Sequence, residues 1–248
     1  MTFGLNKMVG EIEIHSVEGI RACFDEGVSP NDVYNGKPLI YEMINEYSRG
    51  PSFSQCIQVF IDYGLEFEDK TLLAVLANNA EALAQQLAAD SGVVSRRYNL
   101  DCAFTPLFDS TLLHICAEYN HVACAELLLK NGAGVNEKAG EDENGFGGHT
   151  PIFHTVNQNG NKCIDMMRLL LSNGAELFTT VKGLIWGKGH QWETFIPAVN
   201  PISYAMMGLL RQFQRKEENI YAVVNELMKH AYGIDYKPSN VPNAYLNA

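Results

Sequence analysis

A short motif that recurs along the chain restricts what it can fold into more than any other feature. A glycine follows a run of apolar residues near positions 27, 64, 92, 132, 174 and 233, at intervals of 28 to 59 residues. Before each of the first five, small or apolar residues stand eight, five and four positions upstream, as Cys124, Leu127 and Leu128 do before Gly132. That spacing places them on one face of an amphipathic helix, and the glycine is suited to the left-handed residue that ends it. The sequence therefore predicts a series of helical repeats.

A shorter apolar stretch precedes most of these helices and predicts a second helix in each repeat. Threonine before a helix and proline at its first position both favour helix initiation. The shorter helices are expected to begin near Pro38, Thr71, Thr111, Thr150 and Pro201. Each unit then consists of a helix, a tight turn, a second helix and an extended loop.

The two central units resemble the ankyrin repeat, which begins Thr-Pro-Leu-His and ends Leu-Leu…Gly-Ala. Residues 111–136 begin Thr-Leu-Leu-His and contain Leu-Leu-Leu-Lys-Asn-Gly-Ala, and residues 150–177 keep Thr-Pro and Asn-Gly-Ala. Outside these units only the apolar pattern is similar, over about residues 12–236. The resemblance implies one all-α, helix-turn-helix solenoid domain over 1–248, with about six repeats and atypical first and last repeats. It also implies that His114 ties neighbouring loops together by hydrogen bonds.

Three segments lengthen the repeats beyond the usual period of about 33 residues. We predict that residues 93–110, 137–149 and 179–199 are irregular loop insertions, which in solenoids often lie on the binding side. The last insertion contains both tryptophans, and tryptophan is enriched at interface hot spots. Two interpretations stay open: the rings cover the last repeat, or at least one contacts a partner.

The resemblance further implies that two residues of each inner helix face a concave groove. These are polar and differ between units, as in a recognition surface, and Tyr119 is the aromatic one among them. Together with side chains of the insertions, the candidate partner-binding residues are Asn78, Asn79, Glu118, Tyr119, Phe146, Asn157, Gln158, Trp186, Lys188, His190 and Trp192.

Charge argues against two classes of partner. The chain has 18 basic and 29 acidic residues, a net charge of −11, and residues 1–90 alone hold 14 acids against 5 bases. A basic surface is needed to neutralise phosphates or to bind an anionic membrane, so we expect neither nucleic-acid nor membrane binding. The acidic surface serves either solubility or the attraction of a basic protein partner.

We find no pattern that predicts catalysis, a cofactor or a metal. His149 and His154 could share a metal, but no third ligand is evident, and Gly183–Gly189 lacks the spacing of a phosphate-binding loop. The six cysteines form no Cys-x-x-Cys pair, and most lie in apolar patterns, so we expect reduced thiols. With no signal peptide or membrane span in the sequence, the expected location is the cytoplasm, and export as an effector stays open as an alternative.

The expected function is that of a non-catalytic protein-interaction module, a monomer that binds a partner through the groove and the loop tips. Two alternatives stay open. One is a self-assembling structural protein, and the other is a small-molecule binder or enzyme built on the 179–199 loop.

Overall fold

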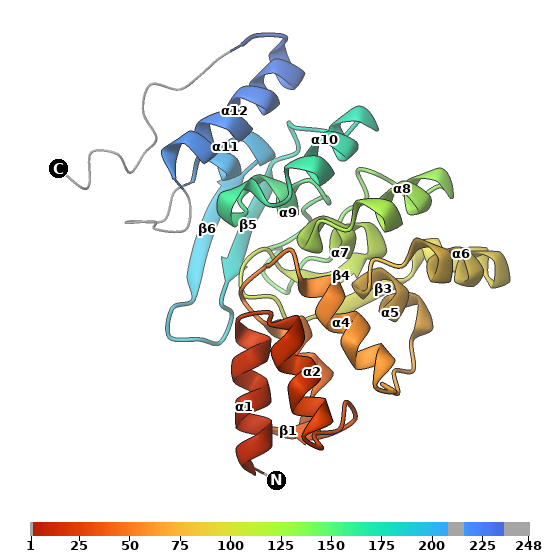
Figure 1. Ribbon diagram of the computed structural model, residues 1–248. Coiled ribbons are helices and arrows are strands. Elements are labelled where there is room, and N and C mark those ends of the chain that lie inside the picture. Colours follow the sequence, from red (N-terminus) through yellow and green to blue (C-terminus); the bar gives the residue numbers. More distant parts are fainter. Residues whose placement is uncertain (1, 208–215, 236–248) are drawn as a thin grey trace.

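The computed structural model describes residues 2–207 and 216–235, and within them the helices form six consecutive pairs (Figure 1). The second helix of each pair packs against the first. The pairs are α1 (Thr2–Glu13) with α2 (Val17–Asp25), α3 (Ile40–Asn45) with α4 (Phe53–Asp62), α5 (Lys70–Leu76) with α6 (Ala80–Ala89), α7 (Leu112–Tyr119) with α8 (Val122–Lys130), α9 (Phe153–Val156) with α10 (Ile164–Ser172), and α11 (Pro201–Met206) with α12 (Glu217–Tyr232).

Five of the six predicted glycines adopt the left-handed conformation beyond the end of a helix. Their φ angles are 100°, 88°, 91°, 85° and 70° at residues 27, 64, 132, 174 and 233. After α8 the amide of Ala133 donates to the carbonyl of Leu128 (3.0 Å), which closes the turn and satisfies a carbonyl that the helix leaves free.

The prediction for Gly92 is wrong. Helix α6 stops at Ala89, and Asp90 adopts an extended conformation. The Asp90 carboxylate accepts a hydrogen bond from the Gly92 amide (2.8 Å), which starts the 3-10 helix η1 (Ser91–Ser95). Asp90 therefore ends the helix, a role that the sequence pattern had assigned to Gly92.

The helices stack in two rows around one continuous apolar core. Helices α5, α7, α9 and α11 pack side by side as the inner row, and α6, α8 and α10 pack side by side as part of the outer row. Helix α7 lies at the centre, and every residue from Leu112 to Tyr119 is buried.

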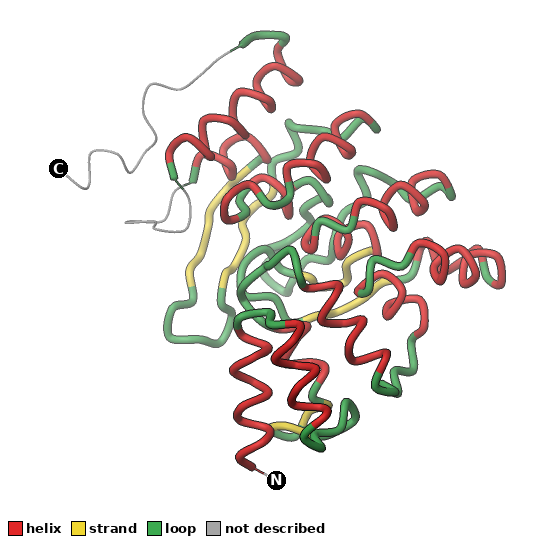
Figure 2. The backbone as a smooth tube through the Cα atoms, in the orientation of Figure 1, coloured by secondary structure: helices red, strands yellow, loops and turns green. Residues whose placement is uncertain are grey.

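The expectation of a purely all-α fold is wrong, because the described residues contain three separate antiparallel hairpins (Figure 2). The insertions predicted as irregular loops supply two of them. The apolar and β-branched residues of these segments favour strands: along β5, Val181, Leu184 and Trp186 are buried while Lys182 is exposed. The hairpins are β1 (Val33–Tyr34) with β2 (Lys37–Pro38), β3 (Arg97–Leu100) with β4 (Leu107–Thr111), and β5 (Val181–Trp186) with β6 (Thr194–Val199).

Candidate partner-binding site

The three insertions are joined to one another by backbone hydrogen bonds. The Gly140 amide donates to the carbonyl of Phe108 in β4 (3.0 Å), which links the second insertion to the first. The Gly147 amide donates to the carbonyl of Gly183 in β5 (2.9 Å), and the Gly187 amide donates to that of Ala103 (2.9 Å). The insertions thus form one connected structure, which we call the hairpin face (residues 97–111, 137–149 and 181–199).

A groove of about 830 Å³ lies between the hairpin face and helix α3. We call it the hairpin groove. This volume is in the range of about 300–1,000 Å³ that is common for ligand sites. Apolar residues of all three insertions line it, among them Leu107, Phe146 and Ile185, together with the partly exposed Cys102. Charged residues, which include Glu42 of α3, Glu141 and Lys188, line it as well.

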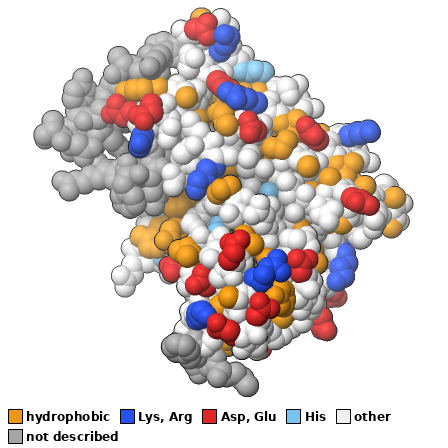
Figure 3. All heavy atoms as spheres, viewed as in Figure 1, with side chains coloured by type: hydrophobic (Ala, Val, Ile, Leu, Met, Phe, Trp, Pro, Cys, Tyr) orange, Lys and Arg blue, Asp and Glu red, His pale blue; other side chains and the backbone are white. Residues whose placement is uncertain are grey.

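Three exposed aromatic rings line this groove or contact residues that line it. Phe108 of β4 is 49% exposed, Trp192 is 47% exposed and Phe195 of β6 is 50% exposed. Phe195 packs on Phe146, with ring centroids 4.7 Å apart, and Trp192 stacks on His190 at 5.4 Å. Hydrophobic side chains gather over the turn of the β5–β6 hairpin in Figure 3. Large exposed aromatic side chains are the residue type on which protein interfaces concentrate their binding energy.

The two tryptophans have different environments. Trp186 is buried, and its indole Nε1 donates to the hydroxyl of Tyr204 in α11 (2.7 Å), so its ring covers the last repeats. Trp192 stays half exposed beside the groove. Lys188 and His190 are exposed, and Lys188 Nζ lies 3.6 Å from the carboxylate of Asp142 in the neighbouring insertion.

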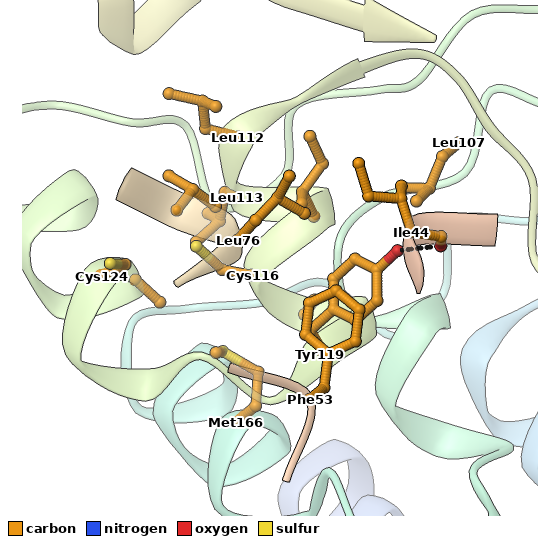
Figure 4. Close-up of a cluster of buried hydrophobic side chains, with 14 of the residues drawn as sticks. Ile44, Phe53, Leu76, Leu107, Leu112, Leu113, Cys116, Tyr119, Cys124 and Met166 are labelled. Carbon is orange, nitrogen blue, oxygen red and sulfur yellow. Dashed lines mark hydrogen bonds between the residues drawn. The ribbon is translucent and has the colours of Figure 1, made fainter. Parts of the chain in front are cut away.

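The prediction that Glu118 and Tyr119 face an open groove is wrong. Glu118 is 2% exposed and Tyr119 is 7% exposed. The end of α3 and the start of α4 cover this end of α7: the Tyr119 hydroxyl donates to the carbonyl of Ile44 (2.8 Å), and its ring stacks on Phe53 at 4.2 Å (Figure 4). The chain itself therefore occupies the position that the repeat pattern assigned to a partner.

The predicted groove residues Asn78, Asn79, Asn157 and Gln158 lie at helix ends and do not gather at one site. Asn78 has a φ of 50°, and its amide oxygen accepts from the backbone of Cys124 (3.3 Å). Asn79 caps the start of α6 by accepting from Ala82 N (2.9 Å). Gln158 donates to the carbonyl of His154 (2.9 Å), and Asn157 is partly buried at the end of α9.

A buried polar network extends from Arg49, between α3 and α4, through the centre of the molecule. Arg49 Nε donates to Glu118 Oε1 (2.9 Å), and Glu118 Oε2 lies 2.8 Å from His154 Nδ1. The Nε2 atoms of His154 and His149 are 3.2 Å apart, a hydrogen-bond distance. Within the described residues, no three or more histidine, cysteine or acidic side chains are arranged to hold a metal.

His114 has the structural role that the resemblance implied. Its Nδ1 accepts from the backbone amide of Thr111 (3.2 Å), which helps to cap α7, and its Nε2 lies 3.1 Å from the carbonyl of His149. One imidazole therefore ties the start of α7 to the loop before α9.

Sequence reasoning did not single out Phe108 or Glu42. In the run from Leu107 to Thr111, a period of two would have placed Phe108 on the face opposite the buried Leu107. Glu42 offered no comparable signal, because it lines the groove only through the packing of α3 against distant insertions.

Stacked helix pairs with hairpins projecting from the connections define a helical repeat protein. Residues 71–181 match the family model for ankyrin repeats, in three copies. The segment from α5 to α10 is therefore similar to three ankyrin repeats. Ankyrin repeats generally mediate protein–protein interactions and are typically non-catalytic. No curated protein matches the chain. No helix among the described residues is long and apolar enough to cross a membrane.

Proposed function

We propose that this chain is a non-catalytic protein-interaction module and that its partner docks on the hairpin face. The observation that carries the proposal is a set of three exposed aromatic residues at the hairpin groove: Phe108 lines it, and Trp192 and Phe195 pack on the lining residues His190 and Phe146. The groove position of Tyr119 is covered by residues 44–53, which leaves the hairpin face as the stronger candidate.

The helix pairs outside residues 71–181 belong, in this proposal, to the same array as divergent repeats of a single domain. Helices α2 and α4 end on left-handed glycines as α8 and α10 do, which supports a common origin for the units. The six unpaired thiols favour action in a reducing compartment such as the cytoplasm.

The proposal is tested by affinity capture from source lysate followed by quantitative mass spectrometry. A hairpin-face variant replaces three rings: Phe108→Ser, Trp192→Ser and Phe195→Ser. A matched control replaces three similarly exposed residues outside the hairpin face: Phe178→Ser, Tyr232→Ser and Ile234→Ser. Truncating a hot-spot aromatic commonly costs about 2 kcal/mol or more in binding.

We expect the wild type and the control variant to retain the same captured protein and the hairpin-face variant to lose it. Capture that survives the hairpin-face substitutions would reject docking on this face. Circular dichroism of all three proteins checks that a lost interaction does not reflect a lost fold.

A further inference from the structure

We propose that the hairpin groove receives a cationic, extended segment of a protein partner, whose arginine or lysine side chains pair with Glu42, Glu141 and Glu143. This inference rests on the proposed function and adds the chemistry of the partner. It is carried by the groove and by the arrangement of charge within it.

The groove holds more negative than positive charge. Five carboxylates and two lysines line it. The lysines are already engaged, since Lys37 Nζ lies 2.9 Å from Asp101 and Lys188 Nζ lies 3.6 Å from Asp142. The remaining carboxylates have no ion pair within 4.0 Å in the described part of the chain, and they are those of Glu42, Glu141 and Glu143.

These carboxylates come from different walls of the groove. Glu42 belongs to α3, whereas Glu141 and Glu143 belong to the inserted segment 137–149. Apolar residues such as Leu100 and Ile185 also line it. Lysine and arginine suit such a surface, because their aliphatic stems pack on apolar atoms while the charged group stays near a carboxylate.

The acidic wall of the groove is held in place by local backbone geometry. Gly148 has a φ of 66°, and its amide donates to the carbonyl of Gly140 (3.1 Å). A Cβ atom at residue 148 would lie 2.6 Å from Glu141 Oε1, so glycine leaves the space in which this carboxylate lies. A preformed wall reduces the ordering that a partner would have to impose on binding.

The surrounding charge favours the same kind of partner. Residues 1–90, which include α3 and Glu42, hold 14 acidic and 5 basic residues. A field of one sign raises the association rate of an oppositely charged partner and repels partners of the same sign.

Three fluorescein-labelled dodecapeptides with identical apolar residues test this inference: one carries four arginines, one four glutamines and one four glutamates. Their binding to the full chain is measured by fluorescence anisotropy at low and high salt. We expect the arginine peptide to bind most tightly and to weaken as salt rises. The groove variant Glu42→Gln, Glu141→Gln, Glu143→Gln is expected to bind it about tenfold more weakly.

The matched control is Glu68→Gln, Glu81→Gln, Glu126→Gln, which changes net charge equally at exposed positions outside the groove. We expect it to bind the arginine peptide as the wild type does. Equal weakening by both triple variants would indicate bulk attraction and overturn the inference. A preference for the neutral or acidic peptide, or no binding of any peptide, would overturn it as well.

The two proposals can fail separately. If partner capture depends on the aromatic rings but the groove variant binds the arginine peptide normally, docking on the hairpin face stands and the cationic partner is rejected. If capture is insensitive to the rings, the docking proposal is rejected whatever the peptides show.

Discussion

At the scale of single residues, the centre of the molecule is organised by a buried carboxylate. Burial alone would raise the pKa of Glu118, but the hydrogen bond to His154 and the charge of Arg49 outweigh it and lower that pKa to about 2. Arg49 has little access to water, with 8% of its side chain exposed. Its charge therefore depends on Glu118 for compensation.

Substituting Glu118→Gln should leave the Arg49 guanidinium buried without its counter-charge. Breaking a buried pair by removing one partner typically costs about 3–5 kcal/mol, and we expect a loss of that order in the free energy of unfolding, measured by urea denaturation. The control Glu26→Gln removes one member of the exposed Lys7–Glu26 pair and should have little effect. Equal effects of the two substitutions would contradict a structural role for the buried pair.

At the scale of secondary-structure elements, the helix ends were the most predictable part of the fold. A glycine in a left-handed conformation ends α2, α4, α8, α10 and α12, and the first four of these glycines lie where the apolar spacing predicts them. The strands of the insertions were not predicted, because the repeat pattern indicates helices and the insertions interrupt it. The burial of Val181, Leu184 and Trp186 depends on how the hairpin packs against the rest of the chain.

Substituting Gly132→Ala should destabilise the chain by about 1 kcal/mol, because φ is 91° there and an L-residue is strained in that region. A Cβ atom at this position would meet nothing within 4 Å, so the cost comes from the backbone alone. The comparison is Gly10→Ala within α1, also in open space, which should stabilise by about 0.5–1 kcal/mol. Thermal unfolding measures the melting temperature of both variants. If the two substitutions shift it in the same direction, the left-handed role of Gly132 is refuted.

At the scale of the whole molecule, buried histidines from separate repeats make stability depend on pH. Burial lowers the pKa of His15 to about 4, of His121 to about 4 and of His149 to about 3. In the unfolded chain a histidine titrates near about 6.5. Below that pH the unfolded state binds protons that the folded state does not, so stability is full above pH 6.5 and falls as the pH drops toward 4.

Within that window, each of these histidines should lower the free energy of unfolding by about 1.4 kcal/mol for every unit by which the pH falls. Urea midpoints measured between pH 7.5 and pH 5 test the expected slope. His121 Nδ1 lies 2.7 Å from the carbonyl of Val75, and His121→Asn can keep a donor there without titrating. The variant should show a shallower pH dependence than the wild type, and an unchanged slope would argue against the buried neutral imidazole.

The sequence by itself determined the repeats, because helix periodicity and glycine stops act over ten residues or fewer, and residues 111–136 and 150–177 carry both. Only the tertiary structure decided which residues are accessible. Arg49 and Glu118 are 69 residues apart, and their pairing buries the place where the resemblance to ankyrin repeats had put a recognition site. Likewise, Glu42 shares a groove with Glu141 because separate elements meet in space. Local patterns specify helices and turns, whereas burial and charge pairing depend on contacts between residues far apart in the chain.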